Sequence, residues 1–357
     1  MGEYLAQGTV REVNAGIAGC RRRGGGLAVL AGLAIGLGLG VGAAADEPSP
    51  LEQYPGRRVM VGDHALHIDC GGQAVPGRPV IVLESGIGGF SLEWHAVKAA
   101  LAREHRVCAY DRAGYGWSDA ARGPRSAARS AHELAILLAA AGEVAPYVLA
   151  GHSYGGYVVR EFAARFPERV AGLVLIDAAA PEQFERLPAG ALPRIWAAAL
   201  VAGTRVHSVP RPAAGFPPAA ATLGMQLMML PKARAAYAAE VVGFAASARH
   251  LAALENEVLA VPLVVLSRGR TEFDAHAGGS AAELAWREMQ AAMVTLSSRA
   301  AHWIATGAGH QVHAERPELV VHALDQVATG AASFTTPAST AVAVAWPVPL
   351  TWVSWVQ

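Results

Sequence analysis

Short apolar runs alternate with amphipathic stretches along most of the chain. Continuous apolar runs are typical of strands that helices cover on both faces, and apolar residues spaced about three to four apart are typical of helices. Runs of the first kind occupy residues 79–84, 105–110, 147–150, 170–176, 262–267 and 302–306. Stretches of the second kind occupy residues 92–103, 130–141, 154–165, 281–297 and 317–327. This alternation predicts an α/β fold with a mostly parallel central sheet flanked by helices.

The sheet is expected to begin with a hairpin and to be interrupted once. Residues 58–61 and 65–70 alternate between apolar and polar, with a glycine-containing turn between them. From about residue 178 to residue 260 the alternation stops, and the chain is rich in Pro, Ala and Met, with a helical patch at 232–242. We interpret 178–260 as a helical lid inserted between strands 6 and 7 of a single domain that spans residues 57–330.

The first 45 residues form a separate region. Three consecutive arginines at 21–23 precede an apolar, glycine-rich run at 27–45, and a polar, proline-bearing linker follows at 46–56. This order is typical of a secretory signal or of an uncleaved N-terminal membrane anchor. In both cases the domain that follows crosses the membrane. We therefore expect a secreted, periplasmic or membrane-anchored protein with its main domain outside the cytoplasm. No role is assigned to the tail, 331–357.

Composition excludes some classes of partner and of metal site. The chain has 29 basic and 29 acidic residues, so its formal charge of zero gives no electrostatic reason to expect nucleic acid. Its three cysteines, Cys20, Cys70 and Cys108, form neither a disulfide framework nor a zinc motif. Cys70 and Cys108 lie near strands expected to be neighbours, and an oxidising compartment would permit a bridge. We interpret both as small buried thiols.

The strongest chemical signal is the sequence Gly-His-Ser153-Tyr-Gly, placed between a predicted strand and a predicted helix. A sharp turn of this kind needs small residues two before and two after the serine, and it exposes the hydroxyl at the edge of the sheet. The N-terminus of the following helix favours negative charge at the same place. Ser153 is therefore the candidate nucleophile.

A serine hydroxyl needs a base to remove its proton. Thirteen histidines are present, and His310 is the one directly after the last predicted strand, where a base is expected. His313, three residues further on, is the nearby alternative.

The acid that orients the base has three candidates. Asp177 ends the apolar strand 170–176, where a buried carboxylate needs a partner, and His310 can be that partner. Asp274 and Glu272 lie in the loop after the strand 262–267, among glycines that indicate a solvated loop. We favour Asp177, with Asp274 and Glu272 as alternatives.

Acyl chemistry also needs donors that stabilise an oxyanion. The backbone N–H of Tyr154, directly after the candidate nucleophile, is expected to be one. The glycine-rich loop Ser85-Gly-Ile87-Gly-Gly89 is expected to supply the other, through the N–H of Ile87.

These residues together resemble the α/β-hydrolase superfamily over about residues 57–327. The matching segments are the loop 85–89, Asp-Arg-Ala-Gly-Tyr-Gly-Trp-Ser at 111–118, the serine turn at 151–156, Leu-Ile-Asp177 and Gly-His310. Many members begin the first loop with His-Gly, where this chain has Ser85-Gly86. Segment 111–118 resembles a structural turn of the family, and no chemistry is assigned to it. An acid at position 177 also looks like the arrangement in certain haloalkane dehalogenases. Those enzymes and epoxide hydrolases, however, use an aspartate where this chain has Ser153.

The resemblance implies a serine hydrolase that cleaves a carboxylic ester of a small, apolar substrate through an acyl-enzyme, without metal or organic cofactor. Amide, thioester or carbon–carbon hydrolysis and acyl transfer remain alternatives, because the fold does not determine the reaction. A protein that binds a small ligand without turnover is the alternative of another class. Three methionines of the lid, Met225, Met228 and Met229, are candidates for an apolar acyl pocket.

Overall fold

The computed structural model describes residues 54–188, 191, 218–254, 258–273, 279–331 and 334–335. The expected leader, 1–45, and most of the linker lie outside the described residues. So do Asp274, the middle of the predicted lid and most of the tail. In the part of the chain that is described, no helix combines the length and the apolar character that a membrane span requires.

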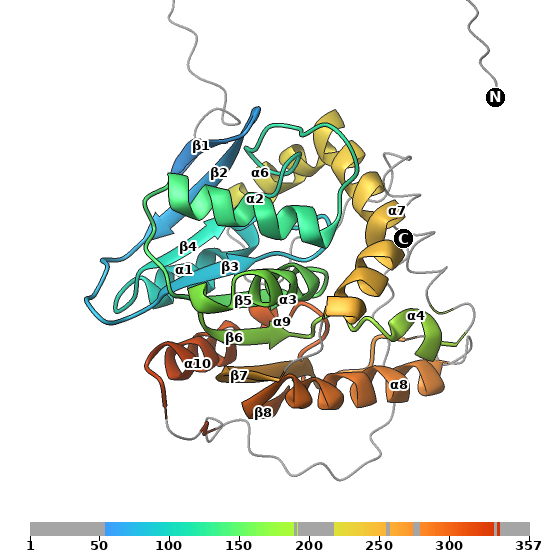
Figure 1. The fold of residues 1–357 in the computed structure, drawn as a ribbon. Helices are drawn as coiled ribbons and strands as arrows, with labels where there is room; N and C mark the ends of the chain where they lie inside the picture. Colours follow the sequence, from blue (N-terminus) through green and yellow to red (C-terminus); the bar gives the residue numbers. More distant parts are fainter. Residues whose placement is uncertain are drawn as a thin grey trace, which may run out of the picture. The chain divides into compact units, whose positions relative to one another are not determined.

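One eight-stranded sheet forms the centre of the domain, in the order β1-β2-β4-β3-β5-β6-β7-β8 (Figure 1). The strands are β1 (Arg57–Val61), β2 (His64–Gly71), β3 (Val80–Glu84), β4 (Val107–Tyr110), β5 (Tyr147–His152), β6 (Val170–Ile176), β7 (Leu259–Arg268) and β8 (Ser297–Ala305). β1 pairs antiparallel with β2, β2 pairs antiparallel with β4, and every other neighbouring pair is parallel. The predicted fold class, a mostly parallel sheet flanked by helices, is confirmed.

Alternate residues of each buried strand pack against helices on opposite faces of the sheet. On β3, Val80 and Val82 belong to one apolar cluster, whereas Ile81 and Leu83 belong to the other. The first cluster includes side chains from α2 (Ala127–Ala140), α3 (Gly155–Arg165) and α8 (Gly279–Ala292). The second includes side chains from α1 (His95–Leu101) and α10 (Pro317–Ala328). Shorter helices are η1 (Ser91–Trp94), η2 (Pro167–Arg169), α4 (Gln183–Arg186), η4 (Met293–Leu296) and α9 (Val312–Glu315).

The boundary between the last helix–strand pair differs from the prediction. The predicted helix 281–297 ends at Ala292, and β8 starts at Ser297, five residues before the predicted start at 302. Ser297 pairs with Leu259 of β7, and its hydroxyl donates to the carbonyl of Val261. Pairing with β7 therefore overrides the helical spacing of the sequence.

Three described helices lie between β6 and β7 in the sequence: the short α4 and two longer ones, α6 (Pro218–Met229) and α7 (Pro231–Leu254). α7 is about twice as long as the patch predicted at 232–242. Two glycines let α7 approach the loops at the carboxyl edge of the sheet: a Cβ on Gly88 would lie 3.0 Å from the ring of Tyr237, and one on Gly114 would lie 2.5 Å from the Cβ of Ala236. α7 therefore packs directly on these two loops.

A disulfide joins Cys70 of β2 to Cys108 of β4. The expectation of two small buried thiols is wrong. The two residues face each other in the antiparallel register of β2 and β4, where opposite Cβ atoms lie about 4.5–5.5 Å apart. The sequence indicates that the strands are neighbours but does not give their register.

We predict that Cys70 and Cys108 resist iodoacetamide in unfolded, unreduced protein and are alkylated after reduction, as measured by peptide mass mapping. Reduction should also lower the free energy of unfolding by about 2–4 kcal/mol, because the bridge constrains the unfolded chain. Alkylation of both thiols before reduction would contradict the pairing.

Candidate active site

Ser153 lies in a tight turn between β5 and α3. Its φ angle is 51°, which is the left-handed region, and its backbone N–H donates to the carbonyl of Ile176 at 3.1 Å. Only glycine fits at the second and third positions after Ser153: a Cβ on Gly155 would lie 2.6 Å from the carbonyl oxygen of Glu84, and one on Gly156 would lie 2.5 Å from the Cβ of Ala178. A strained serine that is partly exposed at the end of a buried strand is the arrangement of an exposed nucleophile.

The carboxylate of Asp177 binds the ring of His310. Asp177 directly follows β6 and is fully buried, and its Oδ2 accepts a hydrogen bond from His310 Nδ1 at 2.6 Å. Arg268 Nη1 donates to the same oxygen at 2.8 Å, and Trp286 Nε1 donates to Oδ1 at 2.9 Å. Burial opposes ionisation, but the charges of Arg268 and His310 and these hydrogen bonds hold the pKa of Asp177 well below its usual value. Asp177 is therefore an ionised partner of the imidazole.

Glu272 contacts the backbone of His310 and not its ring. Its Oε1 accepts a hydrogen bond from the His310 backbone N–H at 3.2 Å, and its carboxylate pairs with Arg270 at 3.3 Å. The other alternative acid, Asp274, lies outside the described residues. Of the two acids that can be compared, Asp177 alone is bonded to the ring.

The ring of His310 lies next to the serine turn. Its centroid is 4.7 Å from that of His152, the residue before Ser153, and its side chain is one-third exposed. Because Nδ1 is bonded to Asp177, Nε2 is the nitrogen available to exchange a proton.

His313 is buried behind the serine turn. Its ring packs against Trp94 at 4.5 Å and against His152 at 4.4 Å between centroids. Burial, together with the nearby charge of His310, lowers the pKa of His313 to about 3, so it is neutral at physiological pH. Burial also lowers the pKa of His152 well below its usual value, and His152 Nε2 donates to the carbonyl of His310 at 2.8 Å. The geometry thus favours His310 over His313 as the base.

The loop after β3 runs beside Ser153. A Cβ on Gly86 would lie 3.2 Å from the Cβ of Ser153. Gly89 N–H donates to Gly86 O at 3.1 Å, which closes the loop. Among the described residues, the loop and turn hydrogen bonds include none donated by the N–H groups of Ile87 or Tyr154, the two expected oxyanion donors.

The three methionines expected at the acyl pocket lie on α6 and are partly buried. Met228 packs against a small apolar cluster that includes Phe90, Tyr115 and Leu227. Such packing is consistent with two interpretations: an ordinary contact between α6 and the core, or part of the lining of a ligand pocket.

The partly buried Glu93 and the buried His152 and His313 form a group of potential metal ligands. One ligand atom from each lies within 4.8 Å of the others. We assign these side chains no metal chemistry.

Several charged or hydrogen-bonding residues around the site were not predicted from the sequence. Arg268 and Trp286 complete the surroundings of Asp177, and Arg112 forms ion pairs with Glu84 and Glu240 in the interior. The available signal was a charged residue in an otherwise apolar or alanine-rich context, as at Glu240 in α7. That signal does not identify the partner, which in this case lies 128 positions away.

Comparison with known proteins agrees with this arrangement. The family model of the α/β hydrolase fold matches residues 79–211. The putative carbamate hydrolase RutD of Azorhizobium caulinodans is 39% identical over 116 residues, which cover 32% of this chain and 42% of that protein. The probable transporter efuK of Hormonema carpetanum is 36% identical over 147 residues, 39% of this chain and 21% of its own length. This chain thus spans less than half of either relative.

The similarity extends further along an uncharacterised protein and two solved structures. YqjL of Bacillus subtilis is 28% identical over 67% of this chain and 79% of its own length. A thermophilic esterase from Thermogutta terrifontis superposes with a TM-score of 0.57 at 24% identity, covering 76% of this chain and 96% of its own. An enol-lactonase from Burkholderia xenovorans superposes with a TM-score of 0.58 at 21% identity, covering 76% of this chain and 100% of its own. The sheet order, the serine turn and these matches show that the chain has the α/β-hydrolase fold.

Proposed function

We propose that the protein is a serine hydrolase that cleaves a carboxylic ester through an acyl-enzyme on Ser153. The observation that supports this most strongly is the hydrogen bond between the buried carboxylate of Asp177 and Nδ1 of His310, 2.6 Å long, beside the turn that exposes Ser153. A carboxylate on Nδ1 fixes the imidazole tautomer whose Nε2 accepts a proton, and it stabilises the imidazolium that then forms.

In the proposed first step, His310 Nε2 removes the proton of Ser153 Oγ while this oxygen attacks the ester carbonyl. The carbonyl oxygen becomes an oxyanion, which the N–H groups of Ile87 and Tyr154 stabilise. The tetrahedral intermediate collapses, and His310 returns the proton to the departing alcohol. Ser153 then holds the acyl group as an ester.

In the second step, water takes the place of the alcohol. His310 removes a proton from the water as it attacks the acyl carbonyl, and the same two N–H groups bind the second oxyanion. Breakage of the bond to Ser153 Oγ releases the carboxylic acid, and the proton on His310 returns to the serine. Because one base serves both steps, loss of His310 or of its tautomer stops both.

A small apolar acyl group is the proposed substrate class. α6 and α7 pack on the loops at the carboxyl edge of the sheet, and we infer that they form a lid over Ser153 with the three methionines as part of its lining. The names of two similar proteins, a putative carbamate hydrolase and an enol-lactonase, also refer to bonds between a carbonyl carbon and a heteroatom. These names support the bond class and not a particular substrate.

We also propose that the domain acts outside the cytoplasm. The expected leader at 1–45 suggests export, and the Cys70–Cys108 disulfide supports it, because disulfides persist mainly in oxidising compartments.

Ser153→Ala should lower kcat/KM for p-nitrophenyl butyrate by about 10³-fold or more, because the step that forms the acyl-enzyme is lost. The unaltered protein should also be labelled by a fluorophosphonate probe, and the variant should not. A folded protein that hydrolyses the ester equally well with alanine at 153 would contradict the proposal. A folded parent with neither turnover nor labelling would favour a binding protein.

Asp177→Asn should reduce kcat by about 10³–10⁴-fold, because an amide favours the wrong imidazole tautomer. Glu272→Gln is the matched control, since its carboxylate contacts His310 through the backbone and not through the ring, and it should change kcat by less than about 10-fold. Asp274→Asn tests the remaining acid. Thermal unfolding should accompany the assays, because Asp177 also pairs with buried Arg268. The choice of acid is wrong if Glu272→Gln or Asp274→Asn, and not Asp177→Asn, abolishes turnover.

A further inference from the structure

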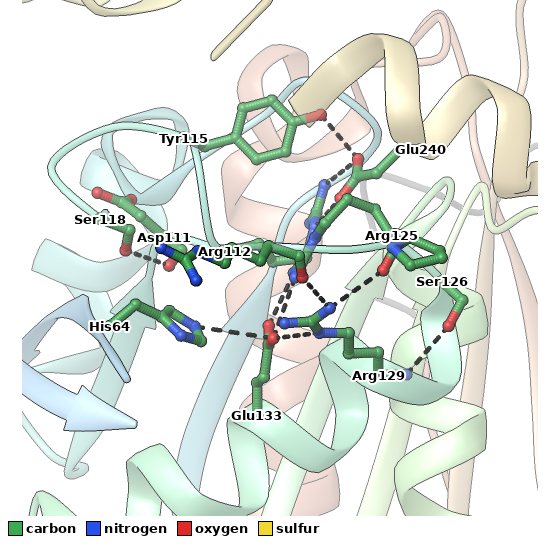
Figure 2. Close-up of polar contacts among 12 residues, drawn as sticks. His64, Asp111, Arg112, Tyr115, Ser118, Arg125, Ser126, Arg129, Glu133 and Glu240 are labelled. Atoms are coloured by element: carbon green, nitrogen blue, oxygen red, sulfur yellow. Dashed lines mark hydrogen bonds and ion pairs between the residues drawn. The ribbon is translucent and has the colours of Figure 1, made fainter. Parts of the chain in front are cut away.

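A buried arginine links the loop after β3 to the inserted helix α7. The side chain of Arg112 is 1% exposed, and each of its five N–H groups has an acceptor. Nε and Nη2 donate to the two carboxylate oxygens of Glu240 at 2.8 and 3.0 Å (Figure 2). Nη1 donates to Glu84 Oε1 at 2.5 Å and to Ser85 O at 2.7 Å. Nη2 also donates to Gly86 O at 2.8 Å. The orientation of the guanidinium is thus fixed on every side.

The hydrogen bond to Gly86 O determines where the N–H of Ile87 points. Gly86 C=O and Ile87 N–H belong to the same peptide unit, and in a planar trans peptide these two groups point in opposite directions. Because the carbonyl points at Arg112, the N–H points away from Arg112. Gly86 lies directly beside Ser153, since a Cβ on Gly86 would be 3.2 Å from the Cβ of Ser153. Arg112 therefore orients the peptide that presents one proposed oxyanion donor.

Arg112 also contacts the residue that presents the other donor. Its Cζ atom lies 5.4 Å from the ring centroid of Tyr154 and 5.2 Å from that of Tyr115, within the range of cation–π contacts. Tyr154 follows Ser153, and its backbone N–H is the second proposed oxyanion donor. One guanidinium thus contacts the peptide that carries the first proposed donor and the side chain of the residue that carries the second.

Glu240 connects this arrangement to the inserted helices. It lies on α7, is fully buried, and accepts a further hydrogen bond from Tyr115 Oη at 2.8 Å. Burial opposes the charge of Arg112, but the carboxylates of Glu240 and Glu84 raise its pKa well above the usual value. Without Glu240, two of the five N–H groups would lose their acceptor in a dry interior, where an unpaired donor is costly. Loss of these two hydrogen bonds therefore favours another orientation of the Arg112 side chain, away from the loop.

We propose that Arg112 is a positioning residue for the oxyanion loop and that Glu240 holds it in place, so that hydrolysis requires α7 to be docked on the core. This inference rests on the proposed hydrolase function. It assigns a role to the segment 111–118, to which the sequence alone gave none. The inserted helices then have a second role besides covering a pocket: the docking of α7 on the core brings Glu240 to Arg112, which completes the site that stabilises the oxyanion.

Glu240→Gln tests the proposal, with Glu133→Gln as the matched control. Glutamine keeps the size of the side chain but places an amide N–H₂ where Arg112 needs an acceptor. Glu133 on α2 is likewise buried and paired with arginines, Arg125 at 2.7 Å and Arg129 at 2.8 Å (Figure 2). In the described part of the chain its carboxylate makes no hydrogen bond to residues 85–87. The control therefore breaks a comparable buried pair without touching the loop.

Three readouts are compared in the full chain: ester kinetics, affinity for a boronic acid and amide hydrogen exchange. Glu240→Gln should lower kcat for p-nitrophenyl butyrate by about 10-fold or more with KM changed less than about threefold, because an oxyanion donor acts in the transition state. The affinity for butylboronic acid, which forms a tetrahedral adduct on serine, should fall by a similar factor. Amide hydrogen exchange of residues 85–89 should become faster. Glu133→Gln should leave all of these near the parent values, and Glu240→Asp should restore part of kcat.

Each outcome decides the inference separately from the hydrolase proposal. Unchanged kcat and unchanged exchange of 85–89 in Glu240→Gln would overturn the inference while the hydrolase proposal stands. Equal losses in Glu240→Gln and Glu133→Gln would also overturn it, because they would show a general loss of stability. Hydrogen exchange of residues 85–89 that becomes faster in Glu240→Gln but not in Glu133→Gln would support the link from α7 to the loop. If the unaltered protein hydrolyses no ester, that link would stand while the hydrolase proposal is rejected.

Discussion

Asp177 places an ionised carboxylate in the dry interior, where an unpaired charge would cost several kcal/mol. Its partners come from three other elements: Arg268 at the end of β7, Trp286 on α8 and His310 in the loop after β8. The carboxyl ends of β6 and β7 and the loop after β8 must therefore meet at one point. The same contacts that neutralise the charge orient the imidazole, so folding and preorganisation of the site have one physical cause. Removal of any one of these partners of Asp177 would therefore disturb both the stability of the fold and the orientation of the imidazole.

A second buried charge organises the other half of the site. Arg112 is surrounded by two carboxylates and two carbonyl groups, and its acceptors come from β3, from the loop that follows it and from α7. Asp177 orients the proposed base, and Arg112 orients the peptide that holds a proposed oxyanion donor. Ser153 needs both, because proton removal and charge stabilisation occur in the same transition state. Glycines 86, 88, 155 and 156 make this possible, since side chains there would collide with the neighbouring elements.

Sequence predicted those features that depend on local pattern. The strand 170–176 was predicted to the residue, because a continuous apolar run ends sharply at Asp177. The preference for Asp177 over Glu272 followed from the cost of burying a carboxylate, and the structure places Asp177, not Glu272, on the imidazole. Features that depend on register or on distant pairs were beyond such reasoning. Cys70 and Cys108 pair because of strand register, and Arg112 meets Glu240 across 128 positions. The start of β8 was misplaced because pairing with β7 extends it beyond its apolar run.

In the proposed mechanism, Ser153 attacks a carbonyl whose oxygen is then held by two backbone N–H groups. A crystal structure of the protein after reaction with a fluorophosphonate tests this most directly, because the adduct resembles the tetrahedral intermediate. We predict phosphorus bonded to Ser153 Oγ, with the phosphoryl oxygen about 2.7–3.1 Å from the nitrogens of Ile87 and Tyr154. We also predict that Arg112 still donates to Gly86 O. An adduct on another residue, or a phosphoryl oxygen directed away from these two N–H groups, would contradict this mechanism.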